Sequence, residues 1–140
     1  MTQLIIIATA AVLFIAVLIG FIRWDFSEIK KGSPIRHGNE LIVRLPCLLP
    51  SAVGLSVAAG HWWVIFISYC MLLSIWWEFF DGVLNKKRGF NWRFNGSFND
   101  PGHKDAFTDK LLKQLEPDQQ AFLKWSLIII FVFVYCWILI

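Results

Sequence analysis

The chain has 140 residues, of which 57% are hydrophobic and only 16% are charged, with a formal net charge of +3. Soluble chains average about 25% charged residues, so this composition excludes an ordinary soluble domain and predicts a single polytopic membrane domain. Its three cysteines lie in apolar runs without C-x-x-C spacing. They are therefore interpreted as small buried hydrophobic residues.

The first predicted membrane span covers residues 4–22, a run of nineteen residues without a charge. At a rise of 1.5 Å per residue, a helix of this length reaches about 28 Å, which suits a hydrocarbon core of roughly 30 Å. A cleaved signal peptide would place basic residues ahead of a shorter apolar run. Only Thr2 and Gln3 are polar ahead of this one, so the run is predicted to be a retained helix.

The second apolar run, Leu45–Gly60, is shorter and has Pro46 and Pro50 near its start. Proline is tolerated in the first turn of a helix, because the first N–H groups have no partner within the helix. The charged end of Arg44 can extend to the interface, so the span is predicted at residues 43–60. A re-entrant or interfacial helix is the alternative.

The third and fourth spans are predicted at residues 61–80 and 120–140. Pairs of tryptophans, Trp62-Trp63 and Trp76-Trp77, stand near the two ends of the third span. Tryptophan favours the headgroup level, where its ring is buried and its N–H stays hydrated. The fourth helix is predicted to begin at Pro117, because proline is favoured at the first helical position.

The distribution of charge predicts the topology. All thirteen basic and all ten acidic residues fall within residues 23–44 and 78–124. Four crossings place both segments on one side of the membrane, whereas a second run that did not cross would make this sorting a coincidence. Because Lys and Arg are enriched in cytoplasmic loops, segments 23–42 and 81–119 are predicted to be cytoplasmic, with both termini outside. A bacterial inner membrane or a viral or phage-derived membrane is expected.

The fold class is therefore predicted as an all-α integral membrane protein with about four transmembrane helices in two hairpins. The second cytoplasmic segment adds two elements. Aromatic residues alternate with polar ones over 90–94, and Asn95-Gly96 follows, which predicts a short β-hairpin. Residues 104–116 have an apolar and a polar face, typical of an amphipathic helix on a membrane surface.

Two candidate surfaces lie near the predicted cytoplasmic face. If the third helix continues past the membrane, Ser74, Glu78, Asp81, Asn85 and Arg88 form a polar stripe along one of its faces, at 100° per residue. The predicted interaction surface consists of Glu78, Asp81, Asn85, Arg88 and Trp92. The residues predicted to contact lipid headgroups are Lys30, Lys31, Arg44, Lys86, Lys87 and Lys124. Each contributes about 1 kcal/mol near an anionic surface.

Glu78 and Asp81 are also candidate ligands for a divalent cation such as Mg²⁺, which takes few carboxylates together with phosphate and water. The alternative is that both carboxylates pair with Arg88 or lysine side chains and fix the loop. No cofactor is otherwise predicted, because the chain contains no phosphate loop, nucleophile elbow, zinc motif or dinucleotide fingerprint.

Asp81-Gly82, Gly96 and Asp100 resemble part of the signature of the CDP-alcohol phosphotransferases, whose aspartates bind metal and the CDP-lipid. This chain has Asn85-Lys86 where that signature has Ala-Arg, and Lys104 where its last aspartate stands. The chain is therefore not assigned to that family.

The middles of the predicted spans contain no ionisable residue, which argues against a pump or coupled transporter. Seven acidic residues nearly balance eight basic ones over 78–124, which argues against nucleic acid as a partner. The predicted function is a non-enzymatic component of a membrane or viral assembly, as a homo-oligomer or a subunit of a larger complex. The alternatives are a lipid-headgroup-binding or metal-dependent lipid-modifying enzyme, and a pore-forming oligomer such as a phage holin.

Overall fold

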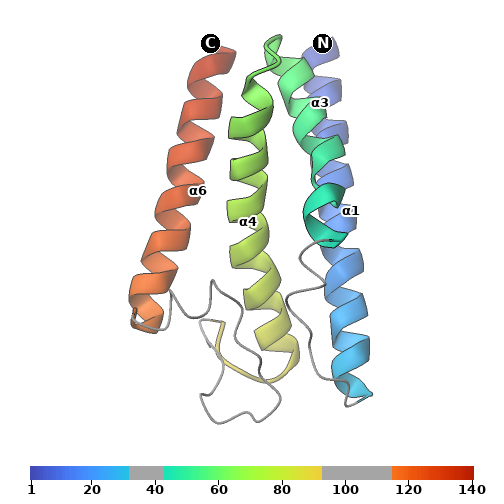
Figure 1. Ribbon diagram of the computed structural model, residues 1–140, viewed down its shortest axis with the longest axis vertical. Coiled ribbons are helices and arrows are strands. Elements are labelled where there is room, and N and C mark those ends of the chain that lie inside the picture. The colour runs from blue at the N-terminus through green and yellow to red at the C-terminus, as the bar shows by residue number, and fades with distance from the viewer. Residues whose placement is uncertain (32–42, 93–114) are drawn as a thin grey trace.

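The structure is a computed structural model that describes residues 1–31, 43–92 and 115–140. Within these ranges it is helical, without strands (Figure 1). The labelled helices are α1 (Thr2–Lys30), α3 (Leu49–Ala59), α4 (Val64–Lys87) and α6 (Pro117–Leu139). They run alternately in opposite directions, so both chain ends and the α3–α4 turn lie at the same end of the molecule (Figure 1).

Three of the helices, α1, α4 and the Asp118–Leu139 part of α6, are long and apolar enough to cross a membrane. The fourth apolar helix, Val43–Ala59, contains α3 and is called the α3 segment below. It is shorter than the other three and spans about 25 Å at 1.5 Å per residue. Pro50 occupies one of the first positions of α3, where the missing N–H leaves no helical bond unmade. The predicted hairpin after residue 92 and the predicted amphipathic helix up to residue 114 lie outside the described residues.

The helix ends follow local chemistry. Gly89 has a left-handed φ of 82°, and its N–H donates to the carbonyl of Lys86 while that of Phe90 donates to Asn85. This Schellman motif satisfies the last carbonyls of α4. The helix α6 begins at Pro117, as the sequence predicts, and Glu116 and Gln119 form a reciprocal capping box. Both α1 and α4 continue well beyond their apolar runs, to Lys30 and Lys87.

The central helix is α4, which packs against α1, α3 and α6. In its lower half, the rings of Trp76 and Phe80 stack with centroids 5.3 Å apart, and Phe21 of α1 meets Trp76 edge-on at 5.6 Å. Trp62 and Trp63 at the other end of the molecule are exposed. The tryptophans at the two ends of the third predicted span therefore differ in exposure, because Trp76 is buried in the core.

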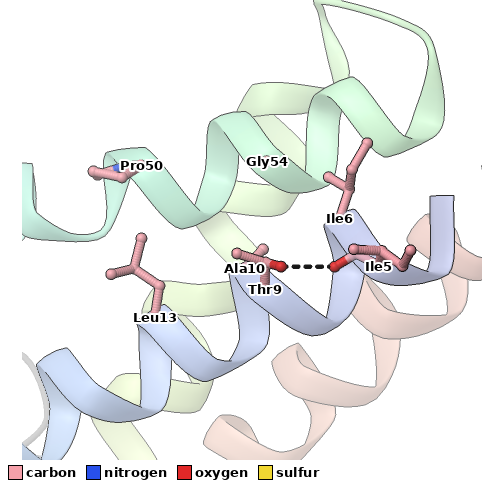
Figure 2. A pocket seen from close by; sticks show the side chains of 7 residues that line it. All are labelled: Ile5, Ile6, Thr9, Ala10, Leu13, Pro50 and Gly54. Carbon is pink, nitrogen blue, oxygen red and sulfur yellow. Dashed lines mark hydrogen bonds between the residues drawn. The ribbon is translucent and has the colours of Figure 1, made fainter. Parts of the chain in front are cut away.

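Helices α1 and α3 approach closely where small residues meet. An apolar groove between them is lined by Ile5, Ile6, Thr9, Ala10, Leu13, Pro50 and Gly54 (Figure 2). The hydroxyl of Thr9 donates to the carbonyl of Ile5 at 2.8 Å, so it is satisfied within its own helix. A Cβ on Gly54 would lie 3.1 Å from that of Ala10. Small residues at such positions let membrane helices pack by backbone approach.

Gly54→Val is therefore expected to lower the free energy of unfolding by about 1–3 kcal/mol, the usual cost of overpacking a tight contact. Gly20→Val on α1 is the matched control, since a Cβ there meets no atom within 4 Å. Denaturation by SDS in mixed micelles measures both variants. Equal losses from the two glycines would contradict the close approach. The pair Ala10→Gly with Gly54→Ala moves one methyl across the contact and should retain most of the stability.

Candidate functional site at the charged end of the helices

The fold gathers the ionisable side chains at one end of the molecule. Among the described residues, every Asp, Glu, Lys and Arg lies on the last turns of α1 and α4, at the start of α6, or close to the start of the Val43–Ala59 helix. These segments share the end opposite the chain termini (Figure 1), and this region is called the charged end below. His61, at the α3–α4 turn, lies at the other end.

Asp25 of α1 and Arg44, just before α3, form a buried ion pair at the charged end. A guanidinium nitrogen of Arg44 lies 2.6 Å from the Asp25 carboxylate, and the two side chains are 10% and 2% exposed. The guanidinium also lies over the rings of Phe21 and Phe80, at 5.5 and 4.9 Å from their centroids. Arg44, a predicted headgroup contact, is therefore enclosed by its own chain, where it joins α1, the α3 segment and α4.

The polar stripe of α4 mostly faces the interior. Ser74, Glu78 and Asn85 are buried, and Asp81 and Arg88 are half-buried. Trp92 forms hydrogen bonds with two of these side chains, Glu78 and Asn85. Its indole N–H donates to the Glu78 carboxylate at 2.8 Å, and the Asn85 amide donates to its backbone carbonyl at 3.1 Å.

The indole of Trp92 lies directly on α4 because Gly82 has no side chain. A Cβ at Gly82 would overlap the ring. Phe79 meets the same indole edge-on, with centroids 6.1 Å apart, and it meets Trp125 of α6 at 6.2 Å. Phe79 of α4 thus contacts both the segment at Trp92 and α6 at the charged end.

Asp81 links α4 to α6. The Lys124 ammonium lies 2.8 Å from the Asp81 carboxylate and 4.7 Å from the centroid of the Trp77 ring. Lys124 is buried, so this predicted headgroup contact pairs within the chain. The predicted alternative of carboxylates paired with lysine describes Asp81, whereas Glu78 takes an indole N–H.

The other predicted headgroup residues remain at the surface. Lys30 and Lys31 at the end of α1 are exposed, as are Lys86 and Lys87 at the end of α4. Arg88 lies over the ring of Phe90 at 5.0 Å.

The two predicted cation ligands, Glu78 and Asp81, have different partners within the chain. Glu78 faces the indole N–H of Trp92, and Asp81 faces the ammonium of Lys124, so each carboxylate already has a hydrogen-bond donor. Among residues 1–31, 43–92 and 115–140, no group of three or more His, Cys, Asp or Glu side chains is placed to hold a metal ion.

Sequence reasoning found most of the residues at the charged end but missed Asp25 and Gly82. Asp25 is the first acid after the first apolar run and Arg44 precedes the second, so the two opposite charges lie at the same end of an antiparallel helix pair. This arrangement is the signal from which the ion pair could have been predicted. No local signal pointed to Gly82, because its role depends on a residue ten positions later.

No protein-family model, curated protein or solved structure matches the chain.

Proposed function

We propose that this chain is a four-crossing membrane protein that serves as a non-enzymatic component of a membrane assembly. In this proposal the charged end faces the cytoplasm. Its part around Glu78, Asp81, Asn85, Arg88 and Trp92 is the surface that contacts a second copy or another subunit. Both chain termini lie on the opposite side of the membrane, which is a bacterial inner membrane or a viral or phage-derived one.

The outer surfaces of the helices support placement in a bilayer. Large apolar side chains are exposed along the whole length of α1 and α6, including Leu4, Val12, Ile19, Ile129 and Phe133. Exposed apolar patches on soluble monomers rarely exceed a few hundred Å², whereas lipid contact is favourable for such side chains. The sorting of charge to one end supports four crossings, because it leaves the hydrocarbon core free of ionised groups.

The non-enzymatic role is supported mainly by the contacts of the polar stripe, which lie within the chain. Glu78 and Asn85 hold Trp92, and Asp81 holds Lys124. Polar side chains that could bind a substrate are instead engaged in fixing α4, α6 and the segment at Trp92 relative to one another. An end stabilised in this way suits the presentation of a fixed surface to a protein partner.

Asp81→Asn tests this role by cross-linking in native membranes. Asp81 is 44% exposed and Lys124 is 10% exposed. The variant should still fold, because the amide oxygen of asparagine can still accept a hydrogen bond from the Lys124 ammonium. We expect the cross-linked species to fall about threefold as the contact to α6 loosens, which corresponds to about 0.7 kcal/mol in association. Glu28→Gln, which neutralises an acid of an exposed ion pair on α1, is the matched control and should leave cross-linking unchanged.

Two outcomes would overturn the proposal. In one, the purified chain is a monodisperse monomer that turns over a phospholipid with Mg²⁺, and Asp81→Asn loses that activity while its assembly stays intact. In the other, the purified chain releases dye from liposomes, which points to a pore. The topology is checked separately with a reporter fused after Ile140 that is active only outside the cytoplasm.

A further inference from the structure

Two lysines from different helices lie against the same aromatic ring at the charged end. The Lys30 ammonium lies 4.8 Å from the centroid of Phe26, one turn earlier on α1. The Lys87 ammonium, at the end of α4, lies 5.1 Å from the same centroid. Both distances are within the range of cation–π attraction, so two lysines from different helices contact the same ring.

The two acids on α1, Asp25 and Glu28, are already engaged. Glu28 pairs with Lys31 at 2.8 Å, and Asp25 pairs with Arg44. Within residues 1–31, 43–92 and 115–140, no ion pair includes Lys30 or Lys87. The carboxyl ends of two helices contribute about half a negative charge each. The two lysines exceed that by about one positive charge, so the position favours an anion.

The pair lies at the depth of lipid phosphates if α1 crosses a bilayer. Phe26 follows Ile22, the last residue of the uncharged run, by one turn, or about 6 Å along the helix. Trp24, at the same depth, is 66% exposed, and exposed tryptophan is typical of the headgroup level.

The same face of α1 continues into the apolar region. At 100° per residue, Ile15 and Ile19 lie within about 20° of Phe26 around the helix, and both are exposed. A molecule whose phosphate lies between the two lysines can therefore extend an acyl chain along Ile19 and Ile15. A free phosphate ion would use only the charged part of this surface.

We propose that Lys30, Lys87 and Phe26 form a binding site for the phosphate of an anionic phospholipid, with an acyl chain along the outer face of α1. The flexible stems of the lysines let both ammonium groups close on one phosphate. This site depends on the membrane placement proposed above and is independent of the proposed assembly.

The test is the selectivity of the reconstituted full chain for spin-labelled phosphatidylglycerol over spin-labelled phosphatidylcholine, measured as the motionally restricted lipid fraction. Lys30→Gln with Lys87→Gln is expected to lower the selectivity about fivefold or more, since it removes both ammonium groups that contact the lipid phosphate in this proposal. Lys86→Gln with Arg88→Gln removes two charges from the end of α4 without touching Phe26 and should retain most of the selectivity. Lys30→Arg with Lys87→Arg should also retain it.

Equal losses in both pairs of Gln variants would overturn the site, because charge in general would then explain the selectivity. No loss in either pair would also overturn it. If the first pair fails to fold, each single variant should lower the selectivity about twofold, and an unchanged value in both would refute the proposal.

Inorganic phosphate distinguishes the source of the ligand. Added phosphate should lower the wild-type selectivity no more than chloride at the same ionic strength. A specific reduction to the level of the first pair would show a site for free phosphate and overturn the lipid assignment. Cross-linking of the same variants separates the two proposals, since loss of lipid selectivity with normal cross-linking leaves the assembly role intact.

Discussion

Asp25→Asn is expected to lower the free energy of unfolding by about 3–5 kcal/mol. The Asp25 side chain is 2% exposed and lies 2.6 Å from the guanidinium of Arg44. Removing one charge of a buried pair is strongly destabilising, because the other charge stays in a poorly hydrated position and loses an opposite charge at contact distance. SDS titration in mixed micelles measures the loss.

Glu28→Gln is the matched control for this prediction, because Glu28 lies on the same helix three residues later and pairs with Lys31 at 2.8 Å on the surface. Exposed pairs contribute about 0–1 kcal/mol, so this variant should be nearly neutral. Replacing both buried partners, Asp25→Leu with Arg44→Met, should recover most of the stability. If Asp25→Asn and Glu28→Gln had similar effects, the buried pair would not be a main contact between α1 and the α3 segment.

Gly82→Ala is expected to lower the free energy of unfolding by about 1–3 kcal/mol. The new methyl would overlap the indole of Trp92, so Trp92 must leave α4. Glu78, which is 4% exposed, then loses the indole N–H that it accepts. The loss of this hydrogen bond by a buried acceptor costs about 1–3 kcal/mol and is the main part of the expected effect. The lost contact of the ring with α4 offsets the gain of about 1 kcal/mol from replacing glycine in a helix.

The control is the same change in a helix position with free space. A Cβ on Gly20 meets no atom within 4 Å, so Gly20→Ala should be neutral or stabilising by up to about 1 kcal/mol. The two substitutions are therefore expected to differ in sign. Trp92→Phe provides an independent check, because it removes the hydrogen bond to Glu78 while keeping an aromatic ring. A stable Gly82→Ala protein would refute the packing of Trp92 on α4.

These two contacts connect the parts of the charged end. The Asp25–Arg44 pair joins the first two helices near Phe80 of α4. Trp92 holds the segment after α4 against Glu78, and the Lys124–Asp81 pair joins α6 to α4. The charged end is thus built from contacts between residues that lie 14 to 43 positions apart in the sequence. Stability measurements on these variants report whether the proposed interaction surface is formed independently of any partner.

The helical class, the extension of α4 beyond its apolar run and the start of α6 at Pro117 were all predictable from the sequence. Apolar run length, the 100° spacing of the polar stripe and the preference of proline for a helix start are local properties. The shorter Val43–Ala59 helix was predictable from the same local signals, although its crossing of a membrane belongs to the proposal. The hairpin at Asn95-Gly96 and the amphipathic helix over 104–114 remain predictions, because these residues lie outside the described ones. Glu116, the last residue of that predicted helix, is the extended N-cap of α6.

The sequence by itself determined which end of the helices carries charge and which residues line the polar stripe of α4, because the order of residues along a helix sets both. Only the tertiary structure decided the partners: Arg44 for Asp25, Trp92 for Glu78 and Lys124 for Asp81. Those pairings depend on the register and rotation of antiparallel helices, which close packing sets across many contacts at once. Helical spacing therefore identified the stripe but not the direction in which it faces.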